Sequence, residues 1–356
     1  MNLNMYDMYI GSYQDPGESG IHHWRVDKSG ILHPLHIVKG IGNPSYLCLD
    51  ADRGRLYAVS ETESHPAVVT LSLASDGRPR RLHGDVSRPT SGSSPCHCSI
   101  LTGPDGLLVA NYGGGTLDTF ALTAAGALGR AQSVRHQGHG RHPTRQTAPH
   151  PHSSALDPDG HFIWVCDLGI DAIIVYRRVG EDGHLVRVAS VATQPGSGPR
   201  MMTFHPRQPY FYVVHELDST VGVYRYRSEG PECACQQILS TLDGDTSGVG
   251  ENWPAHLAIS PDGKMLYVSN RGHDSLAVYA VSEVGDRLEL IRVVPTSARF
   301  PRHFAFTPDH RWMLVAGQRA DGIEVMPVAE DGIPRPGGRC WPVTAPTCIV
   351  VSPYDR

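Results

Sequence analysis

The feature that most restricts the fold of this chain is a pattern that repeats along its whole length. Six segments combine a short apolar run, a turn and a second run rich in β-forming residues, as in "WPAHLAISPDGKMLYVSN" at 253–270. The segments begin at residues 43, 94, 150, 198, 253 and 300, and a shortened seventh copy, "APTCIVVSPYD", begins at 345. Prolines that mark the shared turn lie 45 to 55 residues apart from Pro104 to Pro353. A regular period of this length indicates a repeat architecture in which each unit packs against its neighbours.

The residues of each repeat predict β-strands. The runs "HLAIS", "MLYVSN" and "LAVYAV" are rich in β-branched, aromatic and other apolar residues, and the turn sequences "PDGK" and "RGHD" separate them. A fourth strand fits stretches such as "LELIRVV". Four strands in a unit of about 50 residues are typical of a propeller blade.

The two ends of the chain complement each other. The last copy supplies one inner strand, "TCIVVS", and the N-terminus supplies "MYIGSYQ" and "GIHHWRVD" as outer strands. Joining them completes a seventh blade and removes the open sheet edge that a linear array would expose. We therefore predict an all-β, seven-bladed propeller with four-stranded blades. Residues 1–356 form it as a single domain, because the Pro, Gly and Ser residues are spread evenly and mark no linker.

Charge and composition argue against several classes of partner. The formal net charge is −5 and no long basic block is present, so nucleic acid is not an expected partner. No apolar run reaches the length of a membrane span, and "MNLNMYDMYIGSY" lacks the regions of a secretory signal. The eight Cys show no zinc-finger spacing, and we expect reduced thiols in a cytoplasmic protein. We expect no metal and no cofactor.

Polar residues gather on one rim of the predicted ring. In each blade the first strand runs one way and the second returns, so residues before the first strand lie near residues after the second. The positions before the first strand hold His97, His152, Arg200, His256, Arg302 and His303. The positions after the second strand hold Glu61, Asn111, Asp167, Glu216, Asn270, Arg271, Gln318 and Arg319. Such a titratable rim fits a small anionic ligand and acid–base chemistry, whereas a rim that binds a protein is expected to carry apolar anchors.

Six motifs carry a resemblance to a known family. They are "RQTAPHPHS" at 145–153, "ANYGGG" at 110–115, "GPR" at 198–200, "ELDSTV" at 216–221, "GENW" at 250–253 and "SNRGHDS" at 269–275. Together they resemble the lactonase family of seven-bladed propellers, which includes propeller-type 6-phosphogluconolactonases and 3-carboxy-cis,cis-muconate lactonizing enzymes. The similarity runs from "YIGSY" at 9–13 to "APTCIVV" at 345–351. It implies a cytoplasmic hydrolase that opens 6-phosphoglucono-1,5-lactone in the pentose phosphate pathway without a required metal.

The resemblance also implies a catalytic set. The lactonizing relatives are thought to use one His, two Arg and one Glu, and the matching motifs place these roles on His152, Arg200, Glu216 and Arg271. Nearby positions depart from the family pattern: Met201 and Ala258 stand where many relatives have His, His215 where many have Asn, and His256 where a carboxylate is usual. These departures leave the exact substrate open.

A mechanism for lactone opening follows from these residue types. Glu216 or His152 is expected to activate the attacking water, while Arg200 and Arg271 hold developing charge or a phosphate. The residues expected to bind the substrate, a small anionic sugar lactone, are His97, Asn111, Tyr112, Arg145, Gln146, His150, His256, Asn270 and Arg302. We expect a monomer or a weak homo-oligomer. Two other functions stay open here: a lactonizing cycloisomerase that uses the same residues, and a non-catalytic scaffold.

The His-Pro-His stretch at 150–152 admits more than one role. Pro151 fixes the backbone just before His152, which favours a functional position over that of a buried structural histidine. His150 is expected to have a structural or supporting role. A zinc site would need a third ligand from the Gly-rich segment that holds His136, His139 and His142. We do not expect such a site.

Overall fold

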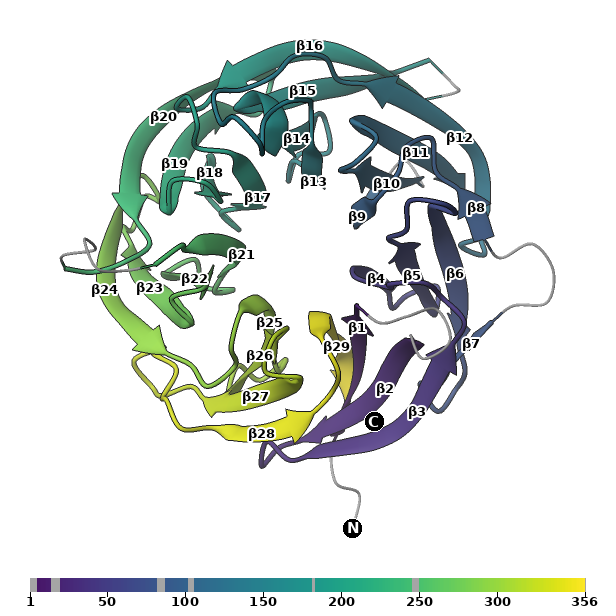
Figure 1. Cartoon of the computed structure of the whole chain (residues 1–356), viewed down its shortest axis with the longest axis vertical. Coiled ribbons are helices and arrows are strands. Elements are labelled where there is room, and N and C mark those ends of the chain that lie inside the picture. The colour runs from purple at the N-terminus through teal and green to yellow at the C-terminus, as the bar shows by residue number, and fades with distance from the viewer. Residues whose placement is uncertain are drawn as a thin grey trace.

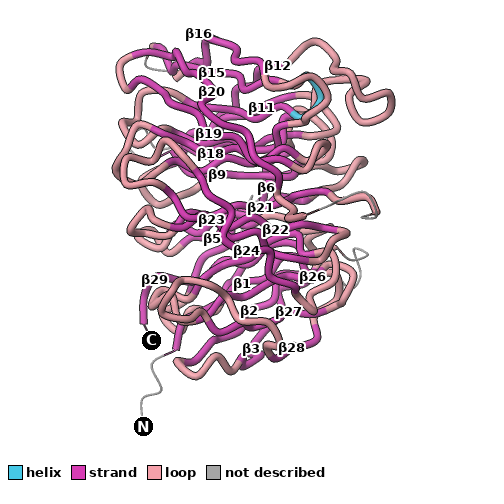
Figure 2. Tube along the Cα trace, turned by 90° about the vertical axis from the view of Figure 1, so that its left-hand side faces the viewer, coloured by secondary structure: helices cyan, strands magenta, loops and turns pink. Residues whose placement is uncertain are grey.

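The chain folds into a closed ring of β-sheets, seen end-on in Figure 1. The computed structural model describes residues 5–13, 20–81, 87–101, 106–180, 183–244 and 250–355. Within these ranges the backbone forms seven antiparallel sheets, each with at least four strands. Helical structure in the described residues is confined to the short 3-10 turn η1 (Leu168–Ile170), so strands and loops make up almost all of the side view in Figure 2. The predicted all-β, seven-bladed propeller is confirmed.

One blade joins the two ends of the chain. Its order is β29 (Pro346–Asp355), β1 (Met5–Ser12), β2 (Gly20–Asp27) and β3 (Leu32–Lys39). The innermost strand, β29, comes from the C-terminal end of the chain and pairs antiparallel with β1, so Met8 lies opposite Val351. Closure of the ring by the N-terminal strands is confirmed, and β3 supplies the fourth strand of this blade.

The other six blades follow one another along the chain. The first contains β4 (Leu47–Asp50), β5 (Arg55–Ser60), β6 (Ala67–Leu73) and β7 (Pro79–Arg81), with β8 (Ser87–Pro89) added beside β6. The second contains β9 (Pro95–Leu101), β10 (Gly106–Asn111), β11 (Thr116–Leu122) and β12 (Leu128–Arg135). The third contains β13 (Pro151–Leu156), β14 (Ile163–Asp167), β15 (Ala172–Val179) and β16 (His184–Ala192).

The remaining three blades repeat this order. They are β17 (Pro199–Phe204), β18 (Tyr210–His215), β19 (Thr220–Arg227) and β20 (Gly230–Ser240); then β21 (Trp253–Ile259), β22 (Met265–Arg271), β23 (Ser275–Val281) and β24 (Leu288–Pro295); then β25 (Pro301–Phe306), β26 (Trp312–Gly317), β27 (Gly322–Pro327) and β28 (Arg339–Pro342). The four runs that predicted strands at 256–294 correspond to β21, β22, β23 and β24.

The hydrophobic core lies between neighbouring blades. Second and third strands are buried on both faces, and β14 is buried at all five of its residues. The aromatic side chains of Trp164 and Phe211, on neighbouring blades, pack with ring centroids 5.2 Å apart. Outer strands such as β16 alternate exposed and half-buried residues. Each fully buried aromatic or aliphatic side chain contributes about 1.5–3 kcal/mol, so the packing between blades stabilises the ring.

The start of each innermost strand has a shared irregularity that positions side chains at the centre of the ring. Strands β9, β13, β17, β25 and β29 all begin with proline, which is tolerated there because it has no N–H to give to the ladder. The next residue in each of these strands is a β-bulge, an extra residue with no opposite partner; these residues are Cys96, His152, Arg200, Arg302 and Thr347. Bulges turn side chains out of the regular pleat and are common beside active sites.

Candidate active site

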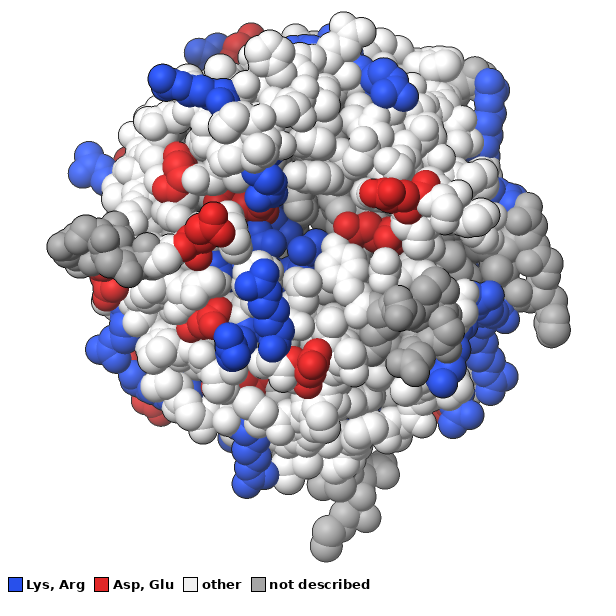
Figure 3. Space-filling model, in the orientation of Figure 1, with Lys and Arg blue, Asp and Glu red and all other residues white. Residues whose placement is uncertain are grey.

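The bulged residues surround a small cavity at one end of the ring. Each of the seven blades contributes to the wall of this cavity. Its wall includes Ser45, Cys96, His152, Arg200, Arg302 and Thr347, and also Tyr46, Met201, His256 and His303. In the space-filling view of Figure 3, basic side chains lie inside the hollow at the centre of the ring, with acidic side chains around its edge. Polar side chains therefore gather around the central axis of the ring.

Glu216, the first residue after β18, is the centre of an ion-pair network. Its Oε2 atom lies 2.8 Å from Nε of Arg200 and 2.6 Å from Nη2 of Arg271. Its Oε1 atom pairs with Nη2 of Arg145, which comes from the long loop before β13. Glu216, Arg200 and Arg271 are buried, whereas the Arg145 side chain is 35% exposed. One carboxylate thus holds three guanidinium groups from three different segments of the chain.

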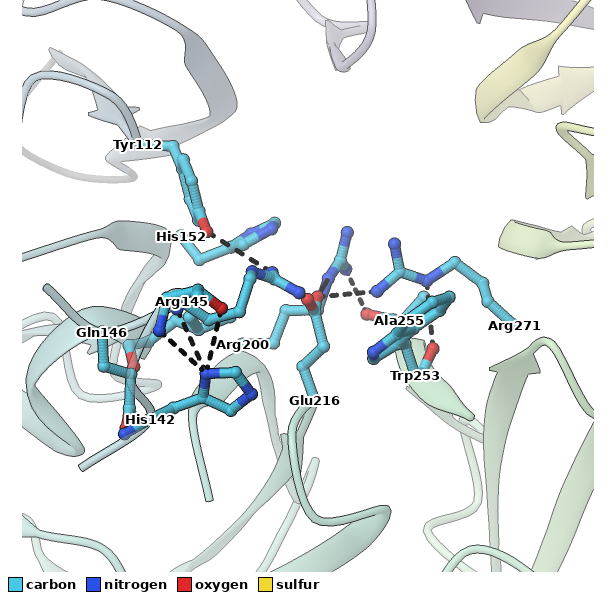
Figure 4. Close-up of polar contacts among 12 residues, drawn as sticks. Tyr112, His142, Arg145, Gln146, His152, Arg200, Glu216, Trp253, Ala255 and Arg271 are labelled. Carbon is cyan, nitrogen blue, oxygen red and sulfur yellow. Dashed lines mark hydrogen bonds and ion pairs between the residues drawn. The ribbon is translucent and has the colours of Figure 1, made fainter. Parts of the chain in front are cut away.

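Backbone carbonyls complete the orientation of the two buried guanidinium groups. Nη1 of Arg200 donates to the carbonyl oxygen of Ala255, and Nε of Arg271 donates to that of Trp253 at 3.0 Å. Among the described residues, Nη2 of Arg200 and Nη1 of Arg271 have no protein partner. Figure 4 shows both guanidinium groups extending from Glu216 towards the open centre of the ring. Two fixed N–H donors are therefore available to an anionic group.

The charges in this network decide its protonation state. Burial by itself raises the pKa of Glu216, but attraction from Arg271, Arg200 and Arg145 outweighs burial and holds the pKa well below its usual value. Glu216 is therefore an ionised carboxylate that is already saturated with donors. Burial, reinforced by repulsion from Arg200, holds the pKa of His152 well below its usual value. The His152 imidazole is therefore neutral.

Aromatic rings and a cation frame the outer edge of the site. Tyr112 stacks on His150, with ring centroids 4.2 Å apart, and stands edge-on to His152 at 5.6 Å. The Nδ1 atom of His150 lies 2.8 Å from the carbonyl oxygen of Tyr112. Nη2 of Arg145 is 3.4 Å from the Tyr112 hydroxyl. These contacts place Tyr112, Arg145 and His150 around His152 and Glu216 (Figure 4 labels all but His150).

A layer of uncharged rings closes the cavity on its inner side. His256 stacks on His303 with centroids 3.8 Å apart, and Tyr46 contacts both His303 and His97. Burial, with repulsion from Arg200, lowers the pKa of His97 and of His303 to about 3. Burial and the neighbouring His303 also lower the pKa of His256 well below its ordinary value. These imidazoles are neutral at physiological pH, so the positive charge of the site belongs to arginine alone.

Comparison with known proteins identifies the family. The family described as "Lactonase, 7-bladed beta-propeller" matches residues 7–351. The chain belongs to this lactonase family. It is 30% identical over 301 residues to the 6-phosphogluconolactonase of Bacillus subtilis, with 84% of each chain covered. It is 36% identical over 283 residues to an uncharacterised protein of Lactococcus lactis, covering 79% of this chain and 80% of that protein.

A solved structure supports the same assignment. The periplasmic gluconolactonase of Pseudomonas aeruginosa has a TM-score of 0.90 and is 28% identical, and the alignment covers 98% of this chain and 99% of that one. No helix among the described residues of the lactonase-family chain is long and apolar enough to cross a membrane.

The structure corrects three of the predicted substrate-binding residues in this lactonase-family chain. Asn111 and Asn270, at the ends of β10 and β22, have buried side chains. Asn111 donates to Thr116 and Asp118 in its own blade, and Asn270 donates to Ser275 in its own blade and to the carbonyl oxygen of Thr241, which follows β20 of the neighbouring blade. Gln146 is buried in its loop and bonds to the carbonyl oxygen of Leu168 and to Asp171. The polar groups of all three side chains are therefore engaged within the protein and do not line the cavity.

The error at the two asparagines has a simple cause. Successive residues of a strand point to opposite faces, so a shift of one residue moves a side chain from one face to the other. The residues that face the site are the next ones along, Tyr112 and Arg271. Asp167, another residue of the predicted rim, likewise turns away and accepts from the backbone N–H groups of His150 and Gly169.

The other predicted residues lie where the rim hypothesis expected them, and their roles remain predictions. His152, Arg200, Glu216 and Arg271 meet at one end of the ring. Tyr112, Arg145 and His150 lie at its outer edge, His97 and His256 in its inner layer, and Arg302 in its wall.

The candidate histidines for zinc do not converge. His136 bonds to Asp167 at 2.7 Å and to the Tyr176 hydroxyl at 2.8 Å, away from the stacked His150. Within the described part of the chain, no three His, Cys, Asp or Glu side chains gather as metal ligands. Of the family departures, Met201 and His256 line the cavity, whereas His215 is buried in its blade beside Thr220 and Tyr224.

Five residues of the site were missed from the sequence: Tyr13, Ser45, Tyr46, Cys96 and Thr347. Ser45, Cys96 and Thr347 follow a proline at the start of an inner segment, as His152 and Arg200 do. Tyr13 is the residue after β1 and bonds to both Glu61 and Arg302. The proline before three of these residues was the available signal. It marks a cavity residue only because a β-bulge follows it, and the sequence pattern does not reveal the bulge.

Proposed function

We propose that this protein is a hydrolase that opens a sugar lactone, and that its substrate is 6-phosphoglucono-1,5-lactone. The observation that carries the proposal is the pair of guanidinium groups, on Arg200 and Arg271, that Glu216 holds beside the neutral imidazole of His152. Membership of the lactonase family and the 6-phosphogluconolactonase of Bacillus subtilis support the reaction class. With this substrate the protein would act in the pentose phosphate pathway in the cytoplasm.

The proposed mechanism divides the work among these groups. His152 accepts a proton from the water that attacks the lactone carbonyl, because its imidazole is neutral and lines the cavity. Arg200 and Arg271 donate N–H groups to the carbonyl oxygen as it becomes an oxyanion. Glu216 does not act as the base, because both of its oxygens already accept from arginine. Its role is to fix the donors in advance.

The anionic end of the substrate fits the outer edge of the site. Arg145 is partly exposed there and has a planar fork that can hold two oxygens of one phosphate. Tyr112 and His150 offer a flat stacked surface beside it. The gluconolactonase of Pseudomonas aeruginosa is named without a phosphate, so the need for this group is a question for experiment.

The test is lactone hydrolysis by purified protein, followed by proton release and corrected for the spontaneous reaction. We expect hydrolysis of 6-phosphoglucono-1,5-lactone, a slower reaction with glucono-1,5-lactone, and a loss of about 100-fold or more in Arg200→Ala. Arg207→Ala is the matched control, because Arg207 lies on the turn at the opposite end of its blade and is exposed. Activity on 3-carboxymuconate alone would replace the proposal with a cycloisomerase, and no activity on any of the three substrates would favour a scaffold.

A further inference from the structure

A second carboxyl group occupies the position in another blade that Glu216 occupies in its own. Glu216 follows β18, and its backbone N–H donates to the carbonyl of Gly198 at 2.8 Å. Glu61 follows β5, and its backbone N–H donates to the carbonyl of Asn43 at 3.0 Å. The propeller repeat therefore presents two glutamates at the same rim of the ring.

The two carboxyl groups have opposite surroundings. Glu216 accepts from three guanidinium groups. Glu61 accepts instead from two hydroxyl groups through its Oε2 atom: the Tyr13 hydroxyl at 2.7 Å and the Ser45 hydroxyl. Among the described residues, no Lys, Arg or His forms an ion pair with Glu61.

Both hydroxyl groups connect Glu61 to the cavity. Ser45 is buried and lines the cavity wall together with His152 and Arg200. Arg302, also in that wall, donates from Nη2 to the Tyr13 hydroxyl at 2.9 Å, with its guanidinium carbon 5.0 Å from the centre of the Tyr13 ring. Glu61 thus lies one hydrogen bond behind the space where the substrate is proposed to bind.

The pKa values of the two glutamates are shifted in opposite directions. Burial raises the pKa of Glu61, and the opposing effects of Arg302, Ser45, Tyr13 and Arg200 do not cancel it. The charge of Glu61 affects the pKa values of three nearby groups, those of Tyr13, Cys96 and Arg302. Attraction to Glu61 contributes to the raised pKa of Arg302. Pairs of acids whose pKa values are pushed apart are a common way to divide acid and base roles.

We propose that Glu61 supplies, through the Ser45 hydroxyl, the proton that the ring oxygen of the lactone takes up when the ring opens. The inference rests on the proposed function. Water forms the new bond to the carbonyl carbon and gives its proton to His152. The bond between that carbon and the ring oxygen breaks, and the ring oxygen takes a proton from Ser45 while Glu61 reprotonates Ser45.

The remaining proton transfers balance the reaction. The new carboxylic acid ionises and releases one proton to solvent. The proton on His152 passes through solvent to Glu61 and restores the starting state. Tyr13 is a positioning residue in this scheme, since its hydroxyl holds the Glu61 carboxyl group, and Arg302 in turn holds the Tyr13 hydroxyl.

The experiment compares Glu61→Gln, Ser45→Ala and Glu63→Gln with the wild type over a range of pH, with melting temperatures to verify folding. Glu63 is the matched control, because it lies two residues from Glu61 and is exposed. We expect kcat to fall by about 100-fold or more in the first two variants and to stay unchanged in Glu63→Gln. In the wild type, kcat should fall as pH rises through the pKa of Glu61, and this decline should be absent in Glu61→Gln.

A change of leaving group gives a second readout. An aryl lactone such as dihydrocoumarin expels a phenolate, which needs a proton less than an alkoxide does. The loss in Glu61→Gln should therefore shrink by at least 10-fold on the aryl lactone, whereas the loss in Arg200→Ala should be similar on both.

The outcomes separate the two proposals. Unchanged kcat in Glu61→Gln, or a lower kcat that keeps the wild-type pH dependence and does not depend on the leaving group, overturns the role of Glu61. Wild-type protein that opens no lactone overturns the proposed function and the inference with it.

Discussion

Replacement of Glu216 by Gln tests whether one carboxylate holds the site together. The side chain keeps its shape, but two buried guanidinium groups, on Arg200 and Arg271, lose their counter-charge. Removing one partner of a buried ion pair costs about 3–5 kcal/mol, because a buried charge is left uncompensated. Arg145 adds little to this figure, because its side chain is 35% exposed and screened by water. A chain of this size should then melt roughly 4–7 °C lower.

The stabilising effect of Glu216 should depend on pH in one direction. The folded-state pKa of Glu216 lies below the ordinary value of 4.5, so its stabilising effect is complete above about pH 4.5 and is lost as pH falls through the folded-state pKa. The difference in unfolding free energy between wild type and Glu216→Gln should therefore be constant from pH 8 to pH 6. It should shrink below pH 4.5.

Calorimetry and denaturant unfolding at several pH values measure this difference. Added sulfate should raise the melting temperature of Glu216→Gln more than that of the wild type, because an anion can bind between the uncompensated guanidinium groups. Lactone hydrolysis should fall by about 100-fold or more as the oxyanion donors lose their orientation. A variant as stable as the wild type at pH 7, with no response to sulfate, would refute the network as described.

Three smaller predictions follow from the same geometry. Arg145→Ala should raise KM for the phosphorylated lactone with little change in kcat or melting temperature, because Arg145 lies at the outer edge of the site; steady-state kinetics with both lactones measures this. His152→Asn should lower kcat by about 100-fold or more. The kcat of the wild type should not decline between pH 7 and pH 6, because the lowered pKa of His152 keeps its imidazole neutral in this range. Protein dialysed against EDTA should hydrolyse lactone at the rate of untreated protein, and a loss restored by a divalent cation would disprove the metal-free mechanism.

The fold was predictable because closure of a propeller is a property of the whole sequence. Regular spacing of turn residues fixed the number of blades, and the C-terminal strand "TCIVVS" required partners that only the N-terminus could supply. Short hydrophobic runs, either alternating with polar residues or continuous, sufficed to identify strands such as β22 and β23. The short β8, beside β6, lacked such a run and could not be predicted.

The site was only partly predictable, because single residues decide which side chains face the axis. Counting from the ends of the strands brought Arg200 and Glu216 to one end of the ring, but it included Asn111, whose side chain bonds within its blade, together with Tyr112, whose ring lies edge-on to His152. Bulges add one residue to the inner strands, and they can be recognised only from the pairing of the strands in the structure. The hydrogen bonds of Ser45 and Tyr13 to Glu61 join segments up to 48 residues apart, which no local pattern encodes.

The site carries a positive charge, whereas the whole chain carries a negative one. The protonation states of its side chains account for this difference. The whole sequence carries a formal charge of −5, yet the site holds the guanidinium groups of Arg145, Arg200, Arg271 and Arg302 around the carboxylate of Glu216. Burial keeps the inner imidazoles neutral, so they add no repulsion to Arg200. A protonated Glu61 would leave the arginine charge uncancelled, which favours an anionic substrate in a region of low dielectric constant. If Glu61 were instead ionised at neutral pH, the site would lose both a unit of positive charge and its proton donor.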